Sequence, residues 1–252
     1  MKTIAFYNIK GGVGKTVSSL SFAQILHDDY NKKVLLVDID KQANATKSLG
    51  CYDPYGLTSA DLLTSREIII DKVIKHSDFG IDVIPASFKL VEANREVMSD
   101  AKRPQQIRFK RQFESIQDKY DYCIIDFPID DTFATINALV ITDDILIPIK
   151  FDKYALDGME YVINDVEELK LFNDKLNVKG CFITMAMGNT SLHKQGAALL
   201  DNALGLKFLK QSIRQSVKVP ESTFKCPLIY YKAAASVAED YRGLVSEYLS
   251  LK

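Results

Sequence analysis

The sequence predicts a doubly wound α/β fold, a mostly parallel sheet with helices on both of its faces. Short apolar runs alternate with longer stretches of helical periodicity along the whole chain, which indicates βαβ units. Most of these runs do not alternate apolar and polar residues, a pattern typical of parallel strands that are buried on both faces. No repeat, low-complexity segment or Pro/Gly/Ser-rich linker divides the chain, so we expect one domain over residues 1–252.

The individual elements follow from these runs in chain order. Strands are expected at Thr3–Tyr7, Val34–Val37, Ile81–Ile84, Tyr122–Asp126, Ile145–Ile149 and Gly180–Met185. Helices are expected at Thr16–His27, Phe88–Met98, Gln105–Lys119, Tyr154–Phe172 and Ser236–Leu249. In a doubly wound sheet ligands bind outside the carboxyl ends of the strands. The residues that follow the strands are therefore the candidate site.

Composition excludes several classes of protein. Among 252 residues, 32 Lys and Arg balance 33 Asp and Glu, so the net charge of −1 argues against a uniformly basic nucleic-acid coat. The four cysteines are widely spaced and form no CxxC pair, which argues against a disulfide framework and against a zinc site. This cysteine usage favours a reducing compartment. No secretory signal precedes the first glycines, and no apolar run approaches the roughly 20 residues of a membrane-spanning helix. We expect a cytoplasmic protein without a membrane anchor.

A glycine-rich loop joins the first strand to the first helix. Its backbone N–H groups and the positive end of the helix would form a nest for anions. Lys15 would reach the β- and γ-phosphates of a nucleotide, and the Thr16 hydroxyl would ligate Mg²⁺. The strict GxxxxGK[ST] pattern fails at Ile9, and an additional lysine stands just inside the loop. The expected nucleotide-binding residues are Lys10, Gly11, Gly12, Val13, Gly14, Lys15, Thr16 and Val17.

Acidic residues follow two of the other predicted strands. Asp38 and Asp40 stand two positions apart, so they would share one face if the pleat of the second strand continued this far. Carboxylates at this edge would support the water shell of Mg²⁺ and orient an attacking water. Asp126 ends the strand Tyr122–Asp126 in a Walker B form and would hold a Mg²⁺-bound water.

The loop and the DIDKQANAT segment resemble the ParA/MinD group of deviant Walker A ATPases. The resemblance covers Thr3 to about Tyr248 and is weaker over Gly50–Met98. It implies that ATP and Mg²⁺ are the cofactors and that ATP is sandwiched in a homodimer, with Lys10 crossing to the partner's nucleotide. It also implies that Asp40 positions the attacking water and that Asp38 supports the metal. Lys10, Lys15 and Asp40 would be the catalytic residues, and Thr16, Asp38 and Asp126 the metal site.

One segment departs from the family pattern. After Asp126 the family usually carries a Pro-Pro-Ser-Leu-Gly run, whereas Phe127–Thr132 contains Asp130 and Asp131. These acids are expected to alter how the second switch senses the γ-phosphate. No arginine after the loop takes an obvious catalytic position, so we expect slow hydrolysis that a partner stimulates.

Two basic segments suggest a role in binding DNA. Lys102–Arg111 and Lys207–Lys232 contain eleven basic residues and one acid, Glu221. The Val217–Glu221 stretch resembles a family motif that touches DNA, which makes Lys218 the first candidate, with Arg214 and Lys225 beside it. We therefore expect non-specific DNA binding through phosphate neutralisation. Ala233–Ser236 lacks the basic residues usual in the family, so DNA affinity would be modest.

These observations favour a partition ATPase that works with a centromere-binding, ParB-like adaptor on the nucleoid. Because the sequence begins at the first strand, we expect no N-terminal helix-turn-helix and no operator-specific binding. Two alternatives stay open. A MinD-like ATPase that acts on a membrane or protein surface would need a basic amphipathic C-terminal helix, but residues 239–252 hold three acids against two bases. An iron–sulfur ATPase would need cysteines at the dimer face, and neither Cys51 nor Cys123 has a spacing that favours a cluster.

Overall fold

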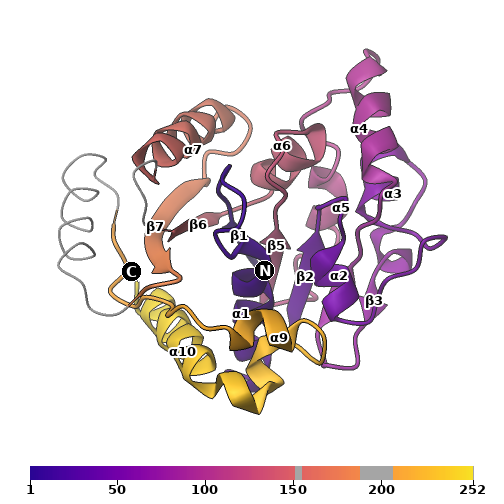
Figure 1. Ribbon diagram of the computed structural model, residues 1–252. Helices are drawn as coiled ribbons and strands as arrows, with labels where there is room; N and C mark the ends of the chain where they lie inside the picture. The colour runs from indigo at the N-terminus through magenta and orange to yellow at the C-terminus, as the bar shows by residue number, and fades with distance from the viewer. Residues whose placement is uncertain (151–154, 188–206, 252) are drawn as a thin grey trace.

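The computed structural model describes residues 1–150, 155–187 and 207–251. In this part of the chain one seven-stranded sheet has the order β3-β4-β2-β5-β1-β6-β7 (Figure 1). All neighbouring strands are parallel except β3 and β4. The strands are β1 (Lys2–Phe6), β2 (Val34–Asp38), β3 (Lys75–His76), β4 (Asp82–Ile84), β5 (Tyr122–Asp126), β6 (Asp144–Lys150) and β7 (Asn177–Thr184).

Helices cover both faces of this sheet. Figure 1 shows α1, α9 and α10 on one side and α4, α6 and α7 on the other. The helices are α1 (Lys15–Asp28), α2 (Asn44–Ser48), α3 (Ser59–Thr64), α4 (Leu90–Ser99), α5 (Lys110–Glu114), α6 (Phe133–Val140), α7 (Ala155–Leu169), α9 (Lys218–Ser222) and α10 (Ala235–Ser250).

The core consists of two layers, because successive strand residues point to opposite faces. Leu35 and Ile125 belong to the layer that also holds buried side chains of α3, α4, α5, α6 and α7. Their neighbours Leu36 and Ile124 belong to the second layer, with α1 and α10. Every residue of β2 is buried. The predicted doubly wound, mostly parallel fold is therefore confirmed.

The helix predicted at Gln105–Lys119 is wrong for most of its length, since only α5, Lys110–Glu114, is helical there. Asn137 of α6 binds the backbone before α5 instead. Its Oδ1 accepts from the Arg108 and Phe109 amides, and its Nδ2 donates to the Gln105 carbonyl. These contacts satisfy polar backbone groups that a longer helix would pair internally.

Strand β3 was also missed by the sequence patterns. Its two residues, Lys75 and His76, are exposed and form the antiparallel edge of the sheet. A two-residue polar segment has none of the apolar signal that identifies a buried strand. Short edge strands of this kind limit unwanted pairing between sheets.

Candidate nucleotide and magnesium site

The glycine-rich loop crosses the carboxyl edge of the sheet between β1 and α1. Gly12 and Gly14 have φ angles of 69° and 87°, in the left-handed region that glycine adopts without strain. A Cβ atom at Gly12 would meet no heavy atom within 4 Å, so the loop is open on that side. The first turn of α1 contains no acidic residue. Its free N–H groups and positive helix end therefore suit a bound phosphate.

Neighbouring strands hold the loop in place. Asn8 Nδ2 donates to the Pro148 carbonyl at 2.9 Å. The Thr184 hydroxyl, at the end of β7, lies 2.8 Å from the Val13 carbonyl oxygen and 3.3 Å from that of Ile149. Hydrogen bonds thus fix the loop to β6 and β7.

Lys15 is buried beneath this loop, with only 7% of its surface exposed. Its Nζ donates to the carbonyl oxygens of Asn8 at 2.8 Å and Lys10 at 3.0 Å. Burial lowers the pKa of the ammonium group, and the charges of Asp126 and Asp40 oppose that effect. Because an ammonium group has three donors, one remains for a phosphate oxygen.

Asp38 and Asp126 lie opposite each other in register at the carboxyl ends of β2 and β5. Both are fully buried. The Asp38 carboxylate accepts hydrogen bonds from Thr46 N at 2.9 Å, Thr46 Oγ1 at 2.7 Å and Asp40 N at 3.0 Å. Burial raises the pKa of Asp38 to about 6, although these hydrogen bonds act in the opposite direction.

Asp126 is the carboxylate with unused capacity. Its Oδ1 accepts from the Ser19 hydroxyl at 3.1 Å, whereas Oδ2 is buried without a hydrogen-bond partner in the described part of the chain. Burial and the charge of Asp38 raise its pKa well above the usual range, while the hydroxyls of Thr16 and Ser19 lower it. A cation placed beside Oδ2 would satisfy this oxygen and offset both causes of the raised pKa.

The residues present fit a magnesium ion. Thr16 and Asp126 offer a hydroxyl and a carboxylate oxygen to the same place, and Asp38 lies next to Asp126. Mg²⁺ usually keeps several waters and takes one or two protein carboxylates together with substrate phosphates. It therefore needs no cage of protein ligands, and within the described ranges no three His, Cys, Asp or Glu side chains gather into one.

Asp40 has a different environment from Asp38. Strand β2 ends at Asp38, so the regular pleat stops before Asp40. Asp40 is half-buried, and its Oδ1 accepts from Gln42 N at 2.9 Å. Its other carboxylate oxygen is left for water or ligand contacts. This difference in burial separates a carboxylate held in the core from one at the surface of the site.

The segment after β5 is tied to three other parts of the protein. Asp130 Oδ2 lies 2.5 Å from Lys41 Nζ, in the segment that follows β2. Asp131 accepts from the Tyr161 hydroxyl of α7, and its Oδ1 lies 3.2 Å from the Tyr7 hydroxyl. Ile129 Cγ2 would be 3.6 Å from a Cβ at Gly11, so this segment also lies against the glycine-rich loop.

A further contact in this cluster was not predicted from the sequence. The Tyr7 hydroxyl donates to Asp165 Oδ2 of α7 at 2.7 Å. Burial, together with the charges of Asp131 and Glu168, raises the pKa of the Asp165 carboxyl, while the bond from Tyr7 lowers it. No local motif identifies Asp165, because it reaches the site only through the packing of α7.

A small apolar cavity lies beside the start of α1 and was also missed. Its volume is about 230 Å³, and its lining includes Gly14, Val17, Thr184, Pro220 and Tyr241. The Tyr241 hydroxyl is hydrogen-bonded to Ser18 Oγ at 3.0 Å, which fixes the aromatic wall. An apolar cavity next to a phosphate loop suits the flat ring of a nucleotide base.

The three DNA candidates lie in or beside α9, and two of them are paired with acids. Arg214 binds both oxygens of Asp240 at 2.7 Å, and Lys218 binds the Glu221 carboxylate at 3.0 and 2.9 Å. Lys225 Nζ lies 5.2 Å from the centre of the Tyr231 ring. The Arg214 and Lys218 side chains remain 55% and 43% exposed, so both charges are still accessible to a ligand.

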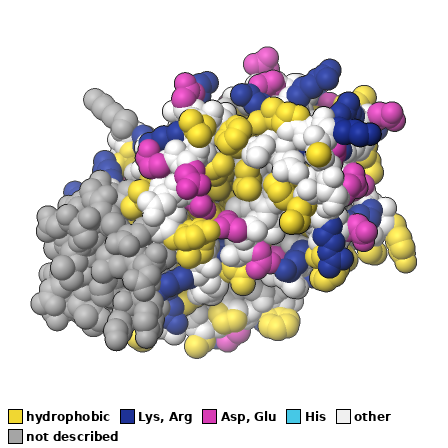
Figure 2. Space-filling view, turned by 90° about the horizontal axis from the view of Figure 1, so that it is seen from above, with side chains coloured by type: hydrophobic (Ala, Val, Ile, Leu, Met, Phe, Trp, Pro, Cys, Tyr) yellow, Lys and Arg dark blue, Asp and Glu magenta, His cyan; other side chains and the backbone are white. Residues whose placement is uncertain are grey.

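Charges of both signs also alternate elsewhere on the surface. Figure 2 shows Lys and Arg side chains interspersed with Asp and Glu on the face seen from above. Among the side chains coloured there, no continuous basic patch covers that face.

The C-terminal helix α10 offers no membrane-binding face in the described structure. Its apolar side chains, Val237, Tyr241, Leu244, Val245 and Tyr248, are buried in the layer that contains α1. An amphipathic anchor has to present such a face to lipid. Among the described residues, moreover, no helix combines the length and the hydropathy needed to cross a bilayer.

Known proteins are similar in sequence to nearly the whole chain. The AAA domain family matches residues 1–178. The sporulation initiation inhibitor protein Soj of Bacillus subtilis is 35% identical over 249 residues, covering 98% of this chain and 97% of the relative. The chromosome-partitioning ATPase Soj of Treponema pallidum is 31% identical over 248 residues, covering 98% and 96%.

Solved structures show the same architecture. A putative plasmid partition protein of Borrelia burgdorferi bound to AMPPNP has a TM-score of 0.80 at 25% identity and covers 98% of each chain. McdA of Cyanothece has a TM-score of 0.85 at 22% identity, covering 100% of this chain and 97% of the other. At that level of identity the second likeness concerns the fold alone.

Proposed function

This chain belongs to the ParA/Soj family of AAA-domain partition ATPases, and from that premise we propose that its ATP-bound homodimer binds non-specific DNA. The observation that supports its nucleotide-dependent part is the buried pair Asp38 and Asp126 beside Lys15 and the glycine-rich loop. Two adjacent buried carboxylates and an ammonium group form a site for a divalent cation with phosphates. ATP with Mg²⁺ is the cofactor, and the reaction is hydrolysis to ADP and phosphate.

Nucleotide binding uses residues Lys10 to Val17. Their backbone N–H groups hold the phosphates, and the Lys15 ammonium donates its third hydrogen bond to a phosphate oxygen. Thr16 and Asp126 hold the metal or its waters, with Asp38 behind them. The cavity of about 230 Å³ beside Gly14 and Val17 receives the adenine ring. Bound Mg²⁺ would neutralise phosphate charge at this site.

Hydrolysis depends on Asp40. Its half-buried carboxylate accepts a hydrogen bond from a water and aims the water oxygen at the γ-phosphorus. The water oxygen forms a P–O bond while the bond to the ADP oxygen breaks. ADP leaves with the electron pair of that bond, and the water loses a proton to a phosphate oxygen. Arg214 lines the base cavity, but its guanidinium is paired with Asp240. The basal rate is therefore slow, and a ParB-like centromere-binding adaptor accelerates it.

Dimerisation depends on Lys10, which reaches the partner subunit's nucleotide across the interface. Light scattering with ATP and Mg²⁺ tests this role. Wild-type protein and a Lys72→Ala control, changed at an exposed lysine next to β3, should be dimers. Lys10→Ala should stay a monomer, and a dimer of this variant would mean that a different surface forms the interface.

The closed dimer presents Lys218, with Arg214 and Lys225 nearby, to the phosphates of DNA. These charges have acidic or aromatic partners in the single chain, so the modest affinity expected from the sequence agrees with their surroundings. DNA binding in the cytoplasm, on the nucleoid, then depends on the nucleotide, and release follows hydrolysis. The apolar face of α10 is buried against the layer that contains α1 and is not presented to lipid. This favours DNA over a membrane as the surface that the dimer binds.

A further inference from the structure

The basic segment Lys102–Arg111 lines a pocket remote from the nucleotide site. The pocket has a volume of about 570 Å³ and lies between residues 62–70, at and after the end of α3, and residues 103–115, which include α5. Its floor is apolar and includes Leu62, Leu63 and Ile70, while Ile69 and Ile107 are 56% and 38% exposed at its mouth. No lining residue belongs to the glycine-rich loop or to the segments after β2 and β5.

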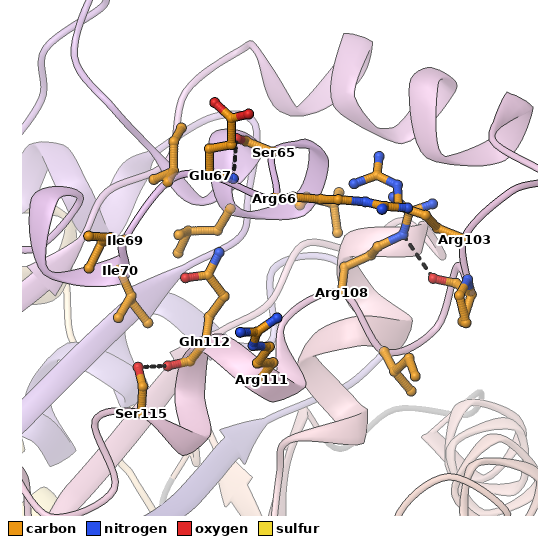
Figure 3. A pocket seen from close by; sticks show the side chains of 15 residues that line it. Ser65, Arg66, Glu67, Ile69, Ile70, Arg103, Arg108, Arg111, Gln112 and Ser115 are labelled. Carbon is orange, nitrogen blue, oxygen red and sulfur yellow. Dashed lines mark hydrogen bonds between the residues drawn. The ribbon is translucent and has the colours of Figure 1, made fainter.

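Four of the seven arginines of the chain line this pocket. In Figure 3 the Arg66, Arg103 and Arg108 side chains extend toward the same end, while Arg111 lies between that end and Ile70. Glu67 is the acidic residue of the lining, and Asp100, outside the lining, pairs with Arg103. Two positive charges are therefore in excess at this place, although the whole chain has a net charge of −1.

Asp100 neutralises only part of this charge. Its Oδ2 accepts from Arg103 Nε at 2.5 Å and from Arg108 Nη2 at 3.1 Å. Arg66 and Arg111 are exposed and make no ion pair or side-chain hydrogen bond with any described residue. Their guanidinium groups are thus free to bind an anion at the rim.

Arg108 has an unused hydrogen-bond donor among the residues that line this pocket. Its side chain is only 6% exposed, and Nε donates to the Pro104 carbonyl at 2.8 Å. Its Nη1 is buried without a hydrogen-bond partner in the described part of the chain. Buried donors of a charged group are almost always satisfied, so the Arg108 guanidinium lacks one of its usual acceptors in the described structure.

We propose that the pocket binds an acidic segment of a partner protein, with an aliphatic side chain on the apolar floor and carboxylates on the arginines. Charge complementarity specifies the carboxylates, since planar guanidinium groups bind them through paired hydrogen bonds. The floor of leucine and isoleucine specifies the aliphatic group. The phosphates of DNA would satisfy the arginines but would leave this apolar floor exposed to water. This surface is independent of the DNA-binding residues and of the nucleotide.

Fluorescence anisotropy on the whole chain tests the proposal, with peptide binding measured without nucleotide and DNA binding measured with ATP. The probes are short labelled peptides of repeated Glu-Glu-Leu, Glu-Glu-Ser and Lys-Lys-Leu units, and labelled duplex DNA. The test variant is Arg66→Ala combined with Arg111→Ala, because neither side chain has a structural partner. Arg95→Ala, an exposed arginine of α4 outside the pocket, is the matched control. Unchanged ATP hydrolysis shows that each variant is folded.

The Glu-Glu-Leu peptide should bind to the wild type and to Arg95→Ala, and about 10-fold more weakly to the double variant. Glu-Glu-Ser should bind more weakly than Glu-Glu-Leu, and Lys-Lys-Leu should not bind. Arg108→Lys, which keeps the charge but removes Nη1, should also weaken binding. Equal affinity in the double variant or no binding by the wild type would overturn the proposal. So would a double variant that, with ATP present, loses the DNA binding of the wild type while it keeps peptide binding, which would assign the surface to nucleic acid.

Discussion

Lys41 and Asp130 connect the two acidic segments of the nucleotide site, with 2.5 Å between Nζ and Oδ2. Lys41 follows β2 and Asp130 follows β5, so the ion pair joins segments that are distant in sequence but adjacent at one edge of the sheet. Asp130 is one of the two acids that depart from the usual family pattern. This contact gives that departure a physical consequence, because the ion pair couples the two segments directly.

Breaking this pair should change turnover more than stability. The side chains are 39% and 42% exposed, so the pair contributes about 0–1 kcal/mol to folding. Lys41→Ala or Asp130→Asn should raise basal ATP hydrolysis several-fold. In these variants no ion pair has to break when the two segments rearrange around the nucleotide. Phosphate release and thermal unfolding measure the two effects, with Lys47→Ala as the control in the same segment. Additive rate effects in the combined variant would contradict the idea that the two residues act as a pair.

Asp40→Ala should separate nucleotide binding from hydrolysis. The carboxylate lies outside the buried pair, so ATP binding and dimerisation should be retained. Hydrolysis should fall by about 100-fold or more, as expected when a group that orients the attacking water is removed. Single-turnover phosphate release checks this, with the exposed Asp78→Ala as control. Unchanged turnover would remove Asp40 from its assigned role.

Acid should selectively weaken the contact between Asp100 and the arginines. Arg103 is the main cause that lowers the pKa of Asp100 to about 2, compared with about 3.9 in an unfolded chain. This carboxylate therefore contributes stability above about pH 4 that is lost as pH falls through about 2. Urea unfolding should show Asp100→Asn to be less stable than the wild type at neutral pH, by a margin that shrinks below about pH 4. A margin that stays constant with pH would show that the contact does not depend on charge.

The pair between Lys218 and Glu221 predicts opposite effects of two substitutions on DNA binding. Glu221→Gln frees the Lys218 ammonium and removes a negative charge that would repel the DNA phosphates. The ATP-dependent affinity for DNA should therefore rise. Lys218→Ala should weaken binding to all sequences and reduce the slope of log affinity against log salt by about one unit. Titrations of labelled duplex DNA over a salt series measure both. A change of sequence preference in place of a change of slope would contradict a phosphate contact.

The parts of the site that are local in sequence were predictable. The glycine-rich loop and Asp126 follow apolar strands directly, and parallel strands bring their carboxyl ends together. The fold was predictable for a similar reason, because β1, β2, β5 and β6 are buried on both faces and carry continuous apolar runs. The resemblance to the partition ATPases is confirmed by relatives that cover nearly the whole chain.

Contacts that depend on strand order were not predictable from these patterns. The ion pair between Lys41 and Asp130 requires β2 and β5 to be neighbours, although 83 residues separate Asp38 from Tyr122 in numbering and β3 and β4 intervene. Asp240 meets Arg214 through the packing of α10. The helix expected at Gln105–Lys119 failed because Asn137, on another helix, binds its backbone. Hydrophobic periodicity predicts which face of an element is apolar, but it does not predict which distant polar side chain contacts that element.

The most direct test of the proposed function is the binding of non-specific duplex DNA with ATP, with ADP and without nucleotide, each over a salt series. We expect wild-type protein to bind only with ATP and to lose affinity steeply as salt rises. Lys15→Ala should show no response to ATP, because its phosphate contact is gone. Equal binding in all three states, or no binding in any of them while ATP still forms the dimer, would contradict a nucleotide-controlled DNA-partitioning ATPase.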